Sequence, residues 1–147
     1  MANEKPQNLQ NHVRLVPAYH MFVFPVLFVN IGWAIFQVVK FPVSFGTIFG
    51  LFLSVALLLL ALYARLFALT VQDRVIRLEM RLRLAEILPP DLRAQIPEFT
   101  VAQLVSMRFA SDAELPALAR KVLADKMNDR KAIKQMVKDW QGDYVRA

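Results

Sequence analysis

The stretch Phe49–Tyr63, FGLFLSVALLLLALY, decides the fold, because only Gly50 and Ser54 interrupt an otherwise hydrophobic run. It lies inside a longer segment, Phe41–Ala64, of 24 residues without a Lys, Arg, Asp or Glu. A second uncharged segment of 25 residues, Leu15–Val39, precedes it. About 20 apolar helical residues cross the roughly 30 Å hydrocarbon core of a bilayer. The two segments therefore predict a pair of membrane-spanning helices.

The linker between the two segments, Lys40–Ser44, is so short that the spans must be antiparallel neighbours in a helical hairpin. A large soluble protein can also bury two apolar helices, but a chain of 147 residues is too short to enclose both. The domain organisation that follows is an N-terminal arm over residues 1–17, a hairpin over 18–64 with spans at about 18–39 and 43–64, and a helical region over 65–147 continuous with the second span.

The composition is uneven along the chain. Nine of the eleven phenylalanines fall between Phe22 and Phe67, whereas fifteen of the eighteen Lys and Arg residues lie at or after Arg65. A membrane half joined to a water-facing half explains this distribution, and a uniform globular domain does not. The 56% hydrophobic content and the lack of cysteine exclude a disordered chain, a disulfide-stapled module and a cysteine-ligated metal domain.

Positive charges around the spans predict their orientation, because Lys and Arg concentrate on the cytoplasmic side of membrane proteins. The linker carries one such residue, Lys40, whereas the outer flanks carry Lys5 and Arg14 before the first span and several arginines after the second. We therefore expect a multi-pass protein of the cytoplasmic membrane with both termini in the cytoplasm.

Small and polar residues mark helix-packing positions within the spans. Gly46, Gly50 and Ser54 recur every four residues, a spacing that lets another helix approach the backbone closely. That helix is either the first span of the same hairpin or an external partner. Asn30, the most polar side chain at mid-membrane depth, bonds either to a partner helix or within its own hairpin.

The helical pattern continues beyond the second span until Pro89-Pro90 ends it. Apolar residues there alternate spacings of three and four, as in a heptad seam: Ala68, Val71, Val75, Leu78, Leu82 and Ala85. We expect this seam to pack on the following helices or on a partner subunit, with Val71, Val75, Leu78 and Leu82 as the partner-binding residues. The basic residues close to the span are expected to attract anionic lipid headgroups; they are Arg65, Arg74 and Arg77.

The remaining residues predict short amphipathic helices, so the fold class is all-α. A turn of helix from Pro90 to Ile96 is stopped by Pro97. The patterns Thr100–Gln103 and Ser111–Glu114 predict capping boxes at two helix starts. Asp129 is expected to cap a last helix that ends at Gly142.

No motif for catalysis is present. Phosphate loops, dinucleotide fingerprints, zincin helices and nucleophile elbows are all missing, and the two histidines, His12 and His20, have no Ser or Cys nearby. His20 lies at interface depth, where it either ligates a haem iron or chlorophyll magnesium or has a structural role. We expect no enzyme activity, no small-molecule substrate, no metal and no intrinsic cofactor; peripheral contact with lipid, chlorophyll or carotenoid is compatible with the spans. Although the net charge is +6, bases are interleaved with acids, which argues against nucleic-acid binding.

Three stretches carry a further signal: Asn11–His20, Val71–Glu79 and Arg108–Pro116, the last followed by Lys134 and Trp140–Tyr144. Over nearly the whole chain these resemble a small bacterial family of two-span membrane proteins catalogued as a domain of unknown function. The resemblance implies a topology and no activity.

The sequence thus favours a non-catalytic accessory or scaffold subunit of a larger cytoplasmic-membrane complex, with other membrane subunits and the lipid bilayer as partners. A photosynthetic reaction centre or respiratory complex is the preferred setting, because small two-span subunits are frequent there. The alternative is a homo-oligomeric membrane adaptor that recruits a soluble partner or anionic lipid through its cytoplasmic helices.

Overall fold

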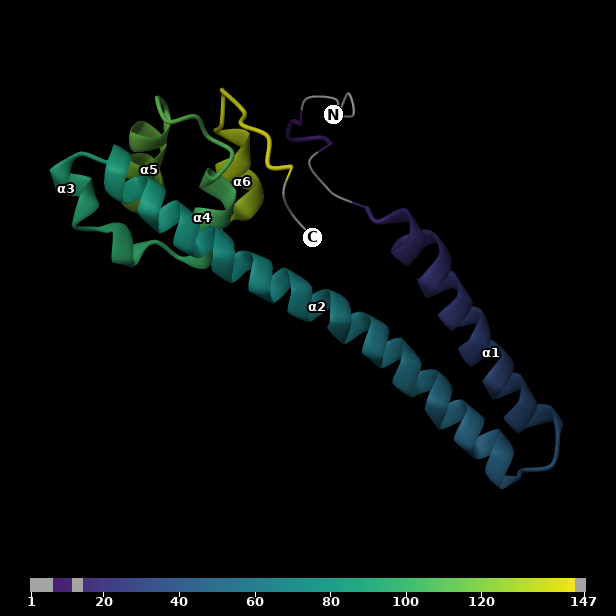
Figure 1. Ribbon diagram of the computed structural model, residues 1–147. Helices are drawn as coiled ribbons and strands as arrows, with labels where there is room; N and C mark the ends of the chain where they lie inside the picture. Colours follow the sequence, from purple (N-terminus) through teal and green to yellow (C-terminus); the bar gives the residue numbers. More distant parts are fainter. Residues whose placement is uncertain (1–6, 12–14, 145–147) are drawn as a thin grey trace. The chain divides into compact units, whose positions relative to one another are not determined.

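The computed structural model describes residues 7–11 and 15–144 and is built from helices (Figure 1). It divides into two units: a hairpin unit, Arg14–Leu69, and a head unit that combines Met1–Val13 with Thr70–Ala147. The flanking charges Lys5 and Arg14, and His12, lie outside the described residues.

The hairpin unit contains a π-helical turn, η1 (Ala18–Val23), the helix α1 (Phe24–Lys40) and the first part of α2 (Phe45–Ile87). Pro25, in the first turn of α1, has no N–H to donate, and the wider π turn precedes it. The predicted helical hairpin is confirmed as two helices long and apolar enough to cross a membrane, Ala18–Lys40 and Phe45–Ile87.

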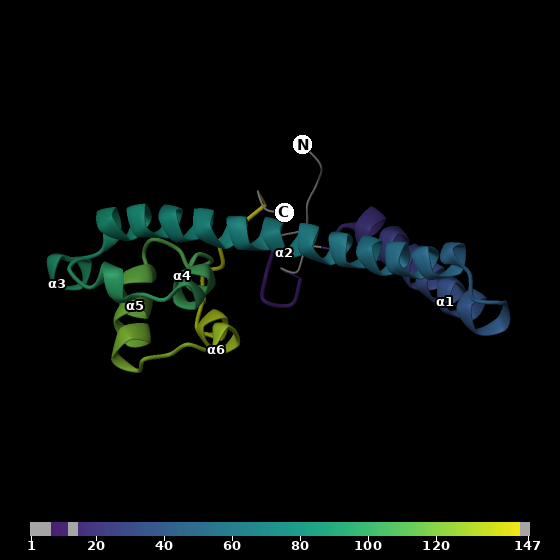
Figure 2. The same cartoon turned by 90° about the horizontal axis from the view of Figure 1, so that it is seen from below.

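Helix α2 continues for 43 residues without a break and ends directly before Pro89-Pro90, as the sequence predicts. Its last residues form part of the head unit together with α3 (Pro90–Arg93), a 3-10 turn η2 (Ile96–Glu98), α4 (Val101–Met107), α5 (Leu115–Ala124) and α6 (Arg130–Gln135). Figure 2 shows α4, α5 and α6 on one side of the end of α2.

The head has one hydrophobic core. Its largest fully buried members come from the end of α2, the residue after it, and the three longer helices of the head: Leu84, Leu88, Leu104, Met107, Leu115, Val122 and Ile133. The short head helices therefore have a rigid element, α2, on which to bury their apolar faces.

Helix caps explain where the head helices begin. The Thr100–Gln103 capping box is confirmed, with both reciprocal bonds present. The Asp129 side chain accepts a hydrogen bond from the Lys131 N–H and caps α6, also as predicted. The second predicted capping box is wrong, because the residue at the N-cap of α5 is Glu114 and its side chain makes no cap bond. Its carboxylate instead accepts the backbone N–H groups of residues 138 and 139.

Two other boundaries differ from the predictions. The helical turn that begins at Pro90 ends at Arg93, and Pro97 lies within η2 instead of stopping a helix. Helix α6 ends at Gln135, well before Gly142. The following segment is held in a non-helical conformation by long-range bonds, including a single β-bridge between residues 110 and 140.

Candidate functional site

Helix α2 has two apolar faces within the head unit, and the head covers only one. Ile76, Met80, Leu84 and Leu88 follow each other at spacings of four and are at most 4% exposed. They form the floor on which α4, α5 and α6 pack. At about 100° per residue, this row lies roughly opposite the predicted heptad seam on the helix circumference.

The seam itself is bare. Val71, Val75, Leu78 and Leu82 are 49–64% exposed, so the expectation that the following helices cover this face is wrong. We call these four residues, with Ala68 and Ala85 at the two ends, the α2 seam. Among the described residues of the head unit, the exposed large hydrophobic side chains are these four and Tyr144. The remaining prediction for the seam is contact with a partner.

The arginines of α2 differ in their partners. Arg74 and Arg77 are exposed and Arg65 is half-buried, and within the described part of the chain none of the three forms an ion pair or side-chain hydrogen bond. Arg83 instead faces the head, where it pairs with the Asp112 carboxylate at 2.6 Å. Its guanidinium also donates to two backbone carbonyls of the loop after α4, those of residues 108 and 110.

A cluster of aromatic and charged side chains around Phe109 holds the C-terminal segment on the head. The rings of Phe109 and Trp140 stack at 4.4 Å, and Phe109 is fully buried. The guanidinium carbon of Arg108 lies 4.2 Å from the Phe109 ring centroid, and its Nε bonds to the Asp143 carboxylate at 3.0 Å. The Lys134 ammonium approaches the same ring at 5.5 Å. These contacts fix a segment that would otherwise leave the head after α6.

The N-terminal arm joins the same cluster. The Gln7 side-chain amide donates to the Asp143 carbonyl and accepts the Asp143 N–H, each at 3.0 Å. Parts of two stretches that resemble the two-span family, Arg108–Pro116 and Trp140–Tyr144, therefore meet at one place, and the arm joins them there. Sequence reasoning missed Gln7, Arg83 and Asp143 as structural residues, since no local pattern predicts contacts between residues that lie 25 to 136 positions apart.

In the hairpin unit, two of the predicted packing residues, Asn30 and Ser54, contact each other across the two helices. The Asn30 side-chain amide donates to the Ser54 hydroxyl at 2.9 Å, and that hydroxyl donates to the Gly50 carbonyl at 2.8 Å. Asn30, Ser54, Gly46 and Gly50 also line an open pocket of about 390 Å³ between α1 and α2. The pocket thus leaves open space beside the small residues of α2.

His20 lies in the π-helical turn at the start of the first span. Its Nδ1 is 3.0 Å from the Val16 carbonyl oxygen and 3.1 Å from the Val16 backbone nitrogen. Its ring packs edge-on against Tyr19, whose hydroxyl donates to the Ala61 carbonyl of α2. The described residues place His20 in no group of three or more potential metal ligands.

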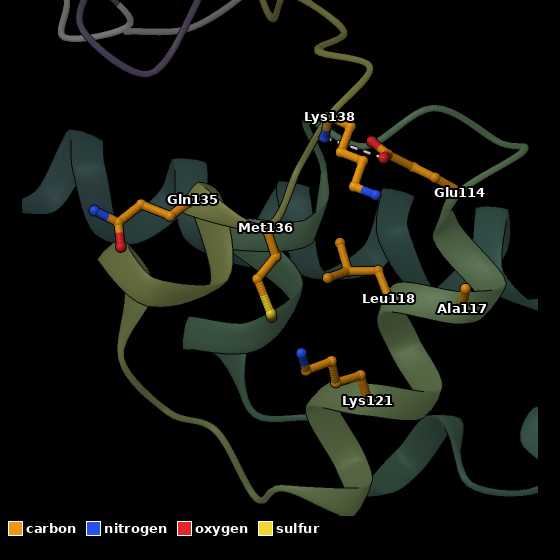
Figure 3. A pocket seen from close by; sticks show the side chains of 7 residues that line it. All are labelled: Glu114, Ala117, Leu118, Lys121, Gln135, Met136 and Lys138. Carbon is orange, nitrogen blue, oxygen red and sulfur yellow. Dashed lines mark hydrogen bonds between the residues drawn. The ribbon is translucent and has the colours of Figure 1, made fainter.

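An open pocket of about 400 Å³ lies in the head between α5 and α6. Figure 3 shows Leu118 and Met136 on its floor and the Lys121 amine directed into it. The Glu114 carboxylate on its rim is occupied by the backbone of residues 138 and 139. The pocket thus combines a hydrophobic floor with the Lys121 amine beside it.

Comparison with known proteins places the chain in a family. No curated protein and no solved structure matches it. Residues 1–147 match DUF6526, a family of unknown function, in agreement with the resemblance drawn from its motifs. The chain therefore belongs to DUF6526.

Proposed function

We propose that this protein is a non-catalytic scaffold subunit, anchored in the bacterial cytoplasmic membrane by its hairpin and presenting its head in the cytoplasm. Large apolar side chains on both spans are exposed, among them Phe22, Phe28, Phe49, Phe52 and Leu60. Such a continuous apolar surface is stable in lipid and would drive association in water.

The connections of the hairpin support an orientation with both termini on one side. The arm at Gln7 and the C-terminal segment at Asp143 are bonded to each other within the head unit. The chain leaves this unit before the first span and returns to it after the second. Two spans that start and end at the same folded unit cross the membrane an even number of times.

The observation that carries the scaffold function is the bare α2 seam. A helix that already buries one face against its own head gains nothing for folding from a second apolar face exposed to water. Protein docking is the use that such a face fits. Small two-span subunits are frequent in bioenergetic complexes, so a photosynthetic or respiratory complex is the first assembly to test.

The second candidate is a homo-oligomeric adaptor that recruits a soluble partner or anionic lipid. It is favoured by the unpaired state of Arg74 and Arg77 within the described structure and by their position after the second span. Binding to vesicles with and without anionic lipid, compared between the wild-type protein and the double variant Arg74→Gln/Arg77→Gln, tests this lipid contact.

The direct test of the scaffold function is purification from native membranes in a mild detergent, followed by native mass spectrometry. We expect the protein in the membrane fraction and a stoichiometric protein partner, either other subunits or further copies. A monodisperse free monomer would contradict the proposal. The absorption spectrum of the same preparation, from wild-type and His20→Ala cells, tests whether His20 ligates a haem or pigment; an unchanged spectrum excludes the ligand role.

A further inference from the structure

We propose that the occupant of the α2 seam is a second copy of this chain, and that the two α2 helices pair in parallel as a short two-stranded coiled coil over residues 68–85. This inference rests on the proposed membrane anchoring, because a shared membrane gives both copies the same orientation. It adds to that function the partner, the direction and the register of the contact.

Beyond Ala68, neither lipid nor the described residues of the head cover the seam. The second span is predicted to end at Ala64, and at 1.5 Å per residue Leu78 and Leu82 lie about 21 and 27 Å further along α2. The headgroup layer on each side of a bilayer is only about 5–7 Å thick. The head packs on Ile76, Met80 and Leu84, on the opposite side of the helix, and so leaves space for a second helix.

The central residue pair of the seam, Val75 and Leu78, suits two strands. With Ala68 at position a of the heptad, Val75 and Leu82 also occupy a positions, and Val71 and Leu78 occupy d positions. A β-branched residue at a followed by leucine at d, as in Val75 and Leu78, favours parallel dimers.

The charges beside the seam identify the partner. Arg74 and Arg81 occupy g positions, whereas Glu79 and Glu86 occupy e positions. In a parallel pair, each g residue faces the e residue five positions later on the other helix. Arg74 then meets Glu79 of the second copy, and Arg81 meets Glu86, which gives four attractive pairs by symmetry. Antiparallel pairing would place arginine against arginine and glutamate against glutamate.

These four charges contrast with those on the other side of α2. Asp73 pairs with Arg130 and Arg83 pairs with Asp112, so the charges that face the head are satisfied within the chain. Among the described residues, those flanking the seam take part in none of the ion pairs. The charges beside the seam are therefore available to a partner helix, whereas Asp73 and Arg83 are already paired within the head.

The seam is short, with only about two and a half heptads, and isolated helices of this length pair weakly. Anchoring both copies in one membrane raises their effective concentration and excludes antiparallel pairing of the two helices. The contact is therefore expected in the membrane or in detergent-solubilised full-length protein.

Cysteine crosslinking of the full-length protein in membranes tests the inference. The chain has no cysteine, so single substitutions report without background. In a parallel pair, identical a or d positions face each other within the Cα spacing that a disulfide accepts. Val71→Cys and Leu82→Cys, near the two ends of the seam, should both form disulfide dimers under mild oxidation. Arg77→Cys, an exposed position on the same helix that points away from the seam, is the matched control and should form roughly tenfold fewer.

Charge reversal tests the register. Glu79→Arg replaces two attractive pairs by two repulsive ones and should lower dimer formation at Leu82→Cys roughly tenfold. The second reversal, Arg74→Glu in the same chain, restores opposite charges and should recover most of the crosslinking. This rescue requires the predicted pairing, since a general loss of folding would not be repaired by a second substitution.

The outcomes separate the two proposals. Crosslinking at both ends of the seam, with rescue by the double reversal, supports the parallel dimer. If only one end crosslinks, or if a membrane-bound protein crosslinks at neither end, the dimer is refuted while the membrane anchoring stands. A stoichiometric adduct between the seam and a different protein likewise refutes the dimer and retains the scaffold function. Absence of the protein from the membrane fraction refutes both.

Discussion

Replacing one leucine on each face of α2 distinguishes the face that holds the head together from the face that is free. Leu84 is fully buried and Leu82 is 64% exposed, although they lie two residues apart on one helix. Leu84→Ala removes about three buried carbon groups, worth about 0.8 kcal/mol each, and leaves a cavity in the core. We expect it to lower the free energy of unfolding of the head by about 3 kcal/mol, within the usual range of 2–5 kcal/mol for buried leucines. Leu82→Ala should change it by no more than about 0.5 kcal/mol.

The assay is urea unfolding of the full-length protein in mild detergent. Of the two tryptophans, Trp140 stacks on buried Phe109 in the head and Trp33 lies in the first span. In a Trp33→Phe background, fluorescence therefore reports head unfolding alone. With a urea dependence of about 1.5 kcal/mol per M, Leu84→Ala should lower the midpoint by about 2 M. Equal losses for the two variants, at a low protein concentration that avoids self-association, would refute the assignment of the faces.

Three further changes test other contacts. Asp143→Asn weakens the partly buried ion pair that holds the C-terminal segment and should lower the free energy of unfolding of the head by about 1–2 kcal/mol. Limited proteolysis should then cleave the variant faster near its C-terminus, and an unchanged cleavage rate would contradict this prediction. Thr100→Ala removes a capping box and should lower the free energy of unfolding of the head by about 1 kcal/mol. Ser111→Ala should lower it by less than about 0.5 kcal/mol, because Ser111 caps no helix. Urea unfolding compares the two variants, and equal losses would indicate that Ser111 does form a capping box. Asn30→Ala should destabilise the hairpin by about 0.6–1 kcal/mol, and a double-mutant cycle with Ser54→Ala in detergent should assign most of this to their hydrogen bond; additive effects would exclude the bond.

Much of the architecture could be predicted because it depends on local periodicity. The uncharged run Phe41–Ala64 and the continued helical spacing after it predict a single helix as far as Pro89. The Thr100–Gln103 box was predictable since a capping box involves residues three apart. Ser111–Glu114 has the same local pattern and failed, because the Glu114 carboxylate binds backbone N–H groups more than twenty residues away.

The sequence by itself determined two long apolar helices, the continuation of the second one, and an apolar row on each side of that helix. Both rows, one through Val75 and Leu78 and one through Met80 and Leu84, satisfy helical spacing, so periodicity could not tell which one the head would bury. Only the tertiary structure decided this, because the choice depends on how several short helices pack together and on where Arg83 reaches its partners. The same packing left the seam exposed. We propose this exposed row as the surface that binds a second copy of the chain.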